Sequence, residues 1–213
     1  MEVASLIVCY STPLEGGGLP SLVAGRSIRL IETGVGPVNA AFALTRALTG
    51  QRADAVIICG VGGAYPSSGL EPGDVACALS ETYGDLGAES PDGFLDMQAL
   101  GFPVVAGAPP ASPLFNTLPL QIFPVERRVP FVTCATCTGT DGKAAEIQAR
   151  TGGAVESMEG AALVHVATLM GVPVGEVRGI SNAVGRRDRA GWRLQDAAAA
   201  ARQSVIAWIE ASS

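Results

Sequence analysis

Short apolar segments alternate with helix-like segments along most of this chain, and this alternation restricts its fold more than any other feature. We predict strands at 3–10, 27–33, 54–60, 73–80, 129–136 and 173–181, and helices at 37–49, 141–150, 157–170 and 192–211. Such alternation indicates a layered α/β domain with a largely parallel sheet. The chain has 213 residues, no repeat and no linker, so we predict one domain over 1–213.

The segment 83–130 interrupts the alternation and is rich in glycine and proline. Long irregular segments in compact domains are usually functional, so we expect a lid or a subunit contact here.

Composition and charge exclude several classes of protein. The chain is 48% hydrophobic and 16% charged, has 27 glycines, and carries a formal net charge of −6. With no basic stripe, we expect neither nucleic acid nor an anionic membrane as a partner. No apolar run is long enough to span a membrane, and the N-terminal residues lead directly into a strand. We expect a cytoplasmic protein that binds a small molecule.

The cysteines and the single histidine do not form a recognisable metal site. Three of the five cysteines lie in apolar runs and are predicted core residues: Cys9, Cys59 and Cys77. Cys134 and Cys137 form a C-x-x-C pair without a second pair or a nearby histidine, so zinc is disfavoured and a redox pair is only a weak alternative. His165 lies inside an apolar helix, which favours a core or subunit-contact role over catalysis. We predict neither a metal nor a cofactor.

Glu159 opens a helix that is apolar almost all round. An unpaired carboxylate in an apolar setting is costly, so Glu159 should face a cleft and bind something that enters it. A sugar diol fits, because a carboxylate can accept from two adjacent hydroxyls. The alternative is that Glu159 only complements the helix dipole.

Two glycine-rich segments, 34–37 and 60–64, follow predicted strands and read as turns whose backbone N–H groups are open to a ligand. The alternative is that they are tight turns alone. Neither completes a dinucleotide-binding motif, and no Walker lysine motif occurs, so NAD and ATP are not supported.

Glu15 lies in a predicted loop after the first strand, and Asn182 ends the last predicted strand. Ligands bind at this edge of an α/β sheet, although Glu15 alone would more often be a solvated residue.

These motifs together resemble the nucleoside phosphorylase superfamily. The matching segments are Pro13-Leu14-Glu15, Gly34-Val35-Gly36, Gly60-Val61-Gly62-Gly63, Met158-Glu159-Gly160-Ala161 and Arg178-Gly179-Ile180-Ser181-Asn182. They keep the family's order from residue 3 to the last helix. The chain is most similar to the hydrolase branch, which includes methylthioadenosine/adenosylhomocysteine nucleosidases. Within it, the segments 136–140 (TCTGT), 157–160 (SMEG) and 179–188 (GISNAVGRRD) resemble the futalosine hydrolases of menaquinone biosynthesis.

The resemblance implies a three-layer fold with a central mixed sheet, and a homo-oligomer, a dimer or larger, with 83–130 partly at the contact. It also implies site roles. Glu159 would bind the ribose 2′- and 3′-hydroxyls, Met158 would pack beneath the sugar, and Glu15 would deprotonate the attacking water. Thr136 and Cys137 would flank the base. Further substrate contacts are expected from Ser181, Val61 and Gly62.

Two departures from the relatives indicate the acceptor and the base. No Lys or Arg precedes Arg26, and Val61 replaces a small polar residue, so a phosphate site is disfavoured and water is the expected acceptor. Asn182 stands where adenine-cleaving nucleosidases have an aspartic acid, and its amide suits a 6-oxopurine such as hypoxanthine. Asp188 is either a substitute acid or, more simply, a partner of neighbouring arginines.

We therefore predict hydrolysis of futalosine. The alternatives are a methylthioadenosine/adenosylhomocysteine nucleosidase, a purine nucleoside phosphorylase, and a nucleoside-binding protein without turnover.

Overall fold

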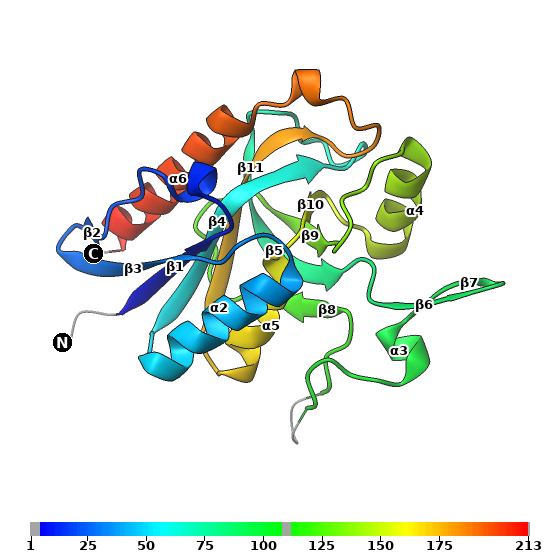
Figure 1. Cartoon of the computed structure of the whole chain (residues 1–213), viewed down its shortest axis with the longest axis horizontal. Helices are drawn as coiled ribbons and strands as arrows, with labels where there is room; N and C mark the ends of the chain where they lie inside the picture. The colour runs from blue at the N-terminus through cyan, green and yellow to red at the C-terminus, as the bar shows by residue number, and fades with distance from the viewer. Residues whose placement is uncertain (1–4, 108–111, 213) are drawn as a thin grey trace.

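The computed structural model describes residues 5–107 and 112–212 (Figure 1). The strands are β1 (Leu6–Tyr10), β2 (Leu22–Val23), β3 (Arg26–Glu32), β4 (Ala55–Ala64), β5 (Val75–Tyr83), β6 (Gly87–Ser90), β7 (Gly93–Asp96), β8 (Thr117–Pro119), β9 (Arg128–Thr133), β10 (Val155–Ser157) and β11 (Val174–Ala183). The helices are α1 (Pro13–Gly16), α2 (Pro37–Gly50), α3 (Met97–Leu100), α4 (Asp141–Thr151), α5 (Gly160–Leu169) and α6 (Leu194–Ala211), with a 3₁₀ turn at Arg189–Gly191.

The main sheet is mixed, as predicted, and runs in the order β10-β9-β5-β11-β4-β1-β3-β2, with β8 paired to β5. The central strands β3, β1, β4 and β11 are parallel. Because β10 pairs with both β9 and β4, the strands β4, β11, β5, β9 and β10 close into a small barrel at one end. The closed end brings the ends of β4, β10 and β11 together.

Helices cover both faces of the sheet, which gives the expected three layers (Figure 1). Successive side chains of a strand point to opposite faces. The face packed against α2 and α5 includes Ile7, Cys9, Val56 and Ile58. The face packed against α6 includes Leu6, Val8, Ile57 and Cys59. Strands β1 and β4 are therefore almost entirely apolar, as expected for strands that are covered on both sides. The predicted core cysteines, Cys9, Cys59 and Cys77, are all buried.

Two local predictions were wrong. The segment 60–64 is not a turn: it continues β4, where it pairs with β10 and β11. Its glycines allow a close approach instead, because a Cβ at Gly60 would lie 2.5 Å from a carboxylate and a guanidinium. The helix predicted from 157 begins at Gly160, because residues 155–157 pair with β9 as strand β10.

The segment 83–130 also holds more structure than predicted. It contains the β6–β7 hairpin, the short helix α3 and strand β8. His165 uses both ring nitrogens: Nε2–H donates to the Val104 carbonyl at 2.8 Å, and Nδ1 pairs with Tyr83 Oη at 3.2 Å. These contacts tie the segment to α5 and agree with a structural histidine.

No helix in the described part of the chain has the length and hydropathy needed to cross a membrane.

Candidate active site

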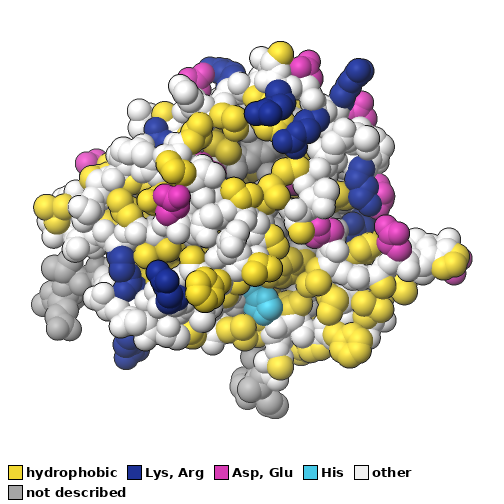
Figure 2. Space-filling model, in the orientation of Figure 1, with side chains coloured by type: hydrophobic (Ala, Val, Ile, Leu, Met, Phe, Trp, Pro, Cys, Tyr) yellow, Lys and Arg dark blue, Asp and Glu magenta, His cyan; other side chains and the backbone are white. Residues whose placement is uncertain are grey.

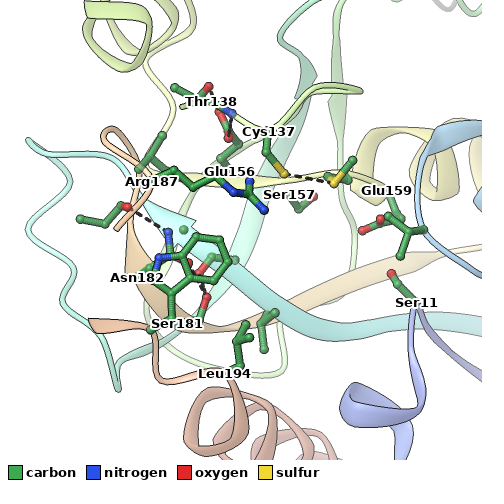
Figure 3. A pocket seen from close by; sticks show the side chains of 18 of the residues that line it. Ser11, Cys137, Thr138, Glu156, Ser157, Glu159, Ser181, Asn182, Arg187 and Leu194 are labelled. Atoms are coloured by element: carbon green, nitrogen blue, oxygen red, sulfur yellow. Dashed lines mark hydrogen bonds between the residues drawn. The ribbon is translucent and has the colours of Figure 1, made fainter. Parts of the chain in front are cut away.

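A cavity of about 340 Å³ opens where β1, β4, β10 and β11 end (Figure 3). Eight of the predicted site residues line it: Glu15, Val61, Gly62, Cys137, Met158, Glu159, Ser181 and Asn182. In Figure 3, Glu159 and Ser11 lie at one end of the cavity and Asn182 and Ser181 at the other. The cavity therefore has the Glu159 carboxylate at one end and the Asn182 amide at the other.

Glu15 enters the cavity from the single-turn helix α1, not from a loop, and is only 4% exposed. Its Oε1 accepts the Val61 N–H at 3.0 Å, and its Oε2 accepts from Thr12 Oγ1 at 2.9 Å. These two donors fix the carboxylate while leaving acceptor positions on both oxygens.

Glu159 is the N-cap residue of α5 and is also 4% exposed. Its Oε1 accepts the N–H of Gly36 at 2.9 Å. Gly36 has a φ of 93°, a left-handed conformation that few residues other than glycine adopt. Burial raises the pKa of the Glu159 carboxyl, and Arg178 and the Gly36 N–H oppose that rise. The predicted cleft-facing carboxylate is therefore present, with backbone support from the first glycine segment.

Arg178 is the central residue that the sequence analysis did not assign. Its side chain is 1% exposed and lies between the two carboxylates: Nη1 is 3.7 Å from Glu15 Oε1 and Nη2 is 3.8 Å from Glu159 Oε2. These distances allow charge attraction without hydrogen bonds. The available signal was an arginine inside an otherwise apolar strand, which requires buried partners.

Glu176 forms the shortest ion pair with Arg178. Its Oε1 accepts from Arg178 Nε at 2.7 Å, and it is completely buried. Glu81 lies next to it, also completely buried, and accepts from Thr133 Oγ1 at 2.9 Å. Burial and the charge of Glu176 raise the pKa of Glu81 well above its usual value. Glu81 Oε1 and Glu176 Oε2 have no hydrogen-bond partner among the described residues, and a proton on Glu81, which its raised pKa favours, would supply a donor between them.

The Asn182 end of the cavity is built from β10, β11 and the loop after β9. Ser181 Oγ donates to Asn182 Oδ1 at 2.7 Å, and Asn182 Nδ2 donates to the Ala183 carbonyl at 2.9 Å. Glu156, which the sequence analysis also missed, accepts from the Thr138 N–H at 2.9 Å and from Thr138 Oγ1 at 2.6 Å. Asn182 and Glu156 therefore place an amide and a carboxylate at this end of the cavity.

Arg186, Arg187 and Trp192 line the same cavity. The Arg187 guanidinium lies 5.2 Å from the Trp192 ring centroid, within cation–π range. An aromatic face and a cation thus lie together at the cavity.

Two predicted site residues lie elsewhere. Thr136 does not line this cavity; it lines a neighbouring one, and its N–H donates to Asp85 Oδ2 at 3.4 Å. Asp188 caps the 3₁₀ turn through the Ala190 N–H, and within the described residues it neither lines the cavity nor forms an ion pair with the neighbouring arginines. In residues 5–107 and 112–212, no group of three or more His, Cys, Asp or Glu side chains is arranged to hold a metal.

Comparison with known proteins identifies relatives of this chain. The family model of the phosphorylase superfamily matches residues 18–211. The chain is 40% identical over 186 residues to the futalosine hydrolase of Streptomyces coelicolor, covering 83% of this chain and 76% of the relative. It is 30% identical over 189 residues to the futalosine hydrolase of Thermus thermophilus, covering 85% and 80%.

Solved structures share the fold at lower identity. A 5′-methylthioadenosine/S-adenosylhomocysteine nucleosidase from Neisseria meningitidis, in complex with methylthio-immucillin-A, aligns with a TM-score of 0.81 and 20% identity, covering 98% of this chain and 99% of that one. The futalosine hydrolase of Helicobacter pylori strain 26695 aligns with a TM-score of 0.79 and 14% identity, covering 98% of each chain.

Proposed function

This chain belongs to the phosphorylase superfamily, and we propose that it hydrolyses the N-glycosidic bond of futalosine in the cavity between Glu15 and Glu159. The observation that carries this proposal is the pair of buried carboxylates on either side of one buried arginine, at the edge of a single cavity. The substrate follows from the curated relatives, which are futalosine hydrolases.

Glu159 binds the ribose in this proposal. Its Oε1 already accepts the Gly36 N–H, so Oε2 and the remaining position on Oε1 are left for the 2′- and 3′-hydroxyls. Met158 follows β10 beside it and packs beneath the sugar, with its Sδ 3.2 Å from Cys137 Sγ. The raised pKa of Glu159 makes its charge sensitive to pH, so ribose binding weakens as the carboxyl becomes protonated.

Glu15 activates the water. A carboxylate that is fixed by Val61 N–H and Thr12 Oγ1 can take one proton from a water while the water oxygen bonds to the anomeric carbon. The C–N bond breaks, its electron pair goes to the base, and the base leaves after gaining a proton. Positive charge develops on the sugar in the transition state, and both carboxylates stabilise it.

Water is favoured over phosphate as the acceptor because the positive charge of Arg178 is already neutralised by neighbouring carboxylates. Arg178 is enclosed by Glu176, Glu15 and Glu159, so its charge is not available to an inorganic anion. A phosphorylase needs charge-assisted donors beside the attacked carbon, and the backbone N–H of Val61 is taken by Glu15. Arg186 and Arg187, which also line the cavity, belong to the loop before α6.

The released base is hypoxanthine in this proposal, and the reaction is a step of menaquinone biosynthesis. The Asn182 amide supports a 6-oxopurine, because it can donate to O6 and accept from a protonated N7. Five free thiols fit a reducing compartment, in line with the expected cytoplasmic location.

A homo-oligomer is supported by an apolar surface over α2 and α5. Exposed side chains there include Val38 and Phe42 on α2 and Leu169 at the end of α5, and Figure 2 shows hydrophobic side chains gathered on this face around the histidine. Large exposed apolar patches mark interaction sites. Phe102, from the segment expected at the contact, is exposed as well. Sedimentation analysis tests this assembly, and a monomer at all concentrations contradicts it.

The function is tested by incubation with futalosine, aminofutalosine, inosine and methylthioadenosine, with and without phosphate. We expect release of hypoxanthine from futalosine at a rate that phosphate does not change. A ribose 1-phosphate product identifies a phosphorylase, preferred release of adenine from methylthioadenosine identifies a nucleosidase, and binding without release identifies a non-catalytic protein.

A further inference from the structure

Glu156 is a third carboxylate at the cavity, and the cleavage chemistry does not use it. It lines the cavity from β10 and is 8% exposed. Its Oε2 accepts from Tyr65 Oη at 2.7 Å and from Thr138 Oγ1 at 2.6 Å, whereas its Oε1 accepts only the Thr138 N–H at 2.9 Å. An ionised carboxylate has about four acceptor positions. Oε1 therefore keeps one position for a donor that enters the cavity.

The strand register places Glu156 opposite Asn182. β10 and β11 flank β4, and Glu156 and Asn182 both pair with Gly63 of that strand. Adjacent strands lie about 4.8 Å apart, so the two backbones are roughly 10 Å apart across β4. Gly63 between them has no side chain, and a Cβ there would lie 3.1 Å from Asn182 Nδ2. The two polar side chains thus stand on either side of a bare strand, an arrangement that suits the edge of a flat ring.

The two purine types differ most sharply at N1. In a 6-oxopurine N1 carries a hydrogen and donates, whereas in a 6-aminopurine N1 has a lone pair and accepts. The Asn182 amide both donates and accepts, so by turning over it can face either kind of base. The Glu156 carboxylate only accepts when ionised. The Glu156 carboxylate therefore distinguishes 6-oxopurines from 6-aminopurines more strictly than the Asn182 amide does.

We propose that Glu156 selects 6-oxopurine nucleosides by accepting a hydrogen bond from N1–H at its free Oε1 position. The proposal rests on the proposed nucleoside hydrolysis and adds the residue that sets the base. A 6-aminopurine would turn its N1 lone pair toward the carboxylate and leave buried acceptors unpaired, which a hydrogen-bonding site penalises strongly.

Turnover of futalosine and of its 6-amino analogue tests the proposal. We expect the wild-type kcat/KM to favour futalosine by about 100-fold or more, and Glu156→Gln to reduce that ratio at least ~10-fold, mainly through loss of futalosine turnover. Tyr65→Phe is the matched control, because it removes one support of Glu156 but keeps the carboxylate. It should preserve the ratio within ~3-fold even if the rates of both substrates fall. An unchanged ratio in Glu156→Gln overturns the proposal.

Binding of free bases gives a second answer that needs no turnover. In 1-methylhypoxanthine a methyl group replaces the N1 hydrogen, so calorimetry on the wild-type protein should show it binding at least ~10-fold more weakly than hypoxanthine. Glu156→Ala removes the acceptor and leaves room for the methyl, so the two bases should then bind within ~3-fold of each other.

Equal binding of the two bases by the wild-type protein, or persistent discrimination by the Glu156→Ala variant, overturns the selector role. Absence of base release from any nucleoside, with these binding differences intact, instead refutes the proposed hydrolysis and keeps the selector.

Discussion

Replacement of Arg178 by methionine should both destabilise the protein and shift the pH dependence of its activity. The guanidinium is 1% exposed and is flanked by Glu176 at 2.7 Å, Glu15 at 3.7 Å and Glu159 at 3.8 Å. At an effective dielectric constant near 20, one charge pair at about 4 Å is worth about 4 kcal/mol, and burial of the charges offsets much of this. Truncation leaves carboxylates buried without a cation, so we expect the free energy of unfolding to fall by about 3–5 kcal/mol at pH 7.

The shift in the pH profile separates a role at the site from a purely structural one. Burial raises the pKa of Glu159, and Arg178 lowers it. Without Arg178 this pKa rises further, so Glu159 stays protonated to a higher pH. The acid limb of the kcat/KM profile should therefore move to higher pH. A change that only disturbed folding would lower the rate without moving the limb.

Urea denaturation and the pH profile of futalosine cleavage measure these two effects. Arg127→Met is the matched control, because Arg127 pairs with Asp74 at 3.1 Å on the surface with 45% of its side chain exposed. That pair is worth only about 0–1 kcal/mol, and the acid limb should not move. If Arg178→Met unfolds like the control and keeps the wild-type acid limb, the inferred charge balance between the carboxylates is wrong.

Three further predictions concern single side chains. Glu15→Gln and Glu159→Gln should each lower kcat by about 10²-fold or more while circular dichroism reports an intact fold; near-normal turnover removes the residue from the mechanism. Asn182→Asp should shift preference toward 6-amino nucleosides, because an acid can protonate N7, and competing-substrate assays measure the shift. The raised pKa of Glu81 means that its stabilising contribution is present below pH 4.5, its ordinary value, and is lost as pH rises through the raised value. Glu81→Gln should therefore flatten the decline of stability above pH 4.5, and an unchanged decline in urea titrations would contradict a raised pKa at Glu81.

The sequence predicted the layered sheet and the cleft-facing Glu159 because their signals are local, whereas most of the other predicted cavity residues followed from the resemblance to the family. A strand that is covered on both faces appears in the sequence as a continuous apolar run. A carboxylate directly before an apolar helix, such as Glu159, stands out because a buried carboxylate needs a partner. Strand β10 could not be predicted, because three residues carry no periodicity and pair only through β9 and β4. Arg178, Glu176 and Glu81 escaped assignment for a related reason. Glu176 and Arg178 are two residues apart on β11, but Glu15, Glu159 and Glu81 are distant in sequence and only the fold brings them beside this pair.

The two glycine segments were correctly predicted to lie at the site, but the function predicted for their backbone N–H groups was wrong. Their backbone N–H groups were predicted to be open to a ligand, but Val61 N–H donates to Glu15 and Gly36 N–H donates to Glu159. Glycine is needed at 60 because a Cβ would collide with Arg178 and Glu15. A backbone donor fixes a carboxylate without adding a positive charge. Glu15 can therefore stay available to a water proton, and Glu159 to hydroxyls, while Arg178 stays beyond hydrogen-bond distance. Direct hydrogen bonds from the arginine would occupy those same oxygens, so backbone support and a withdrawn cation together leave the carboxylates free to react.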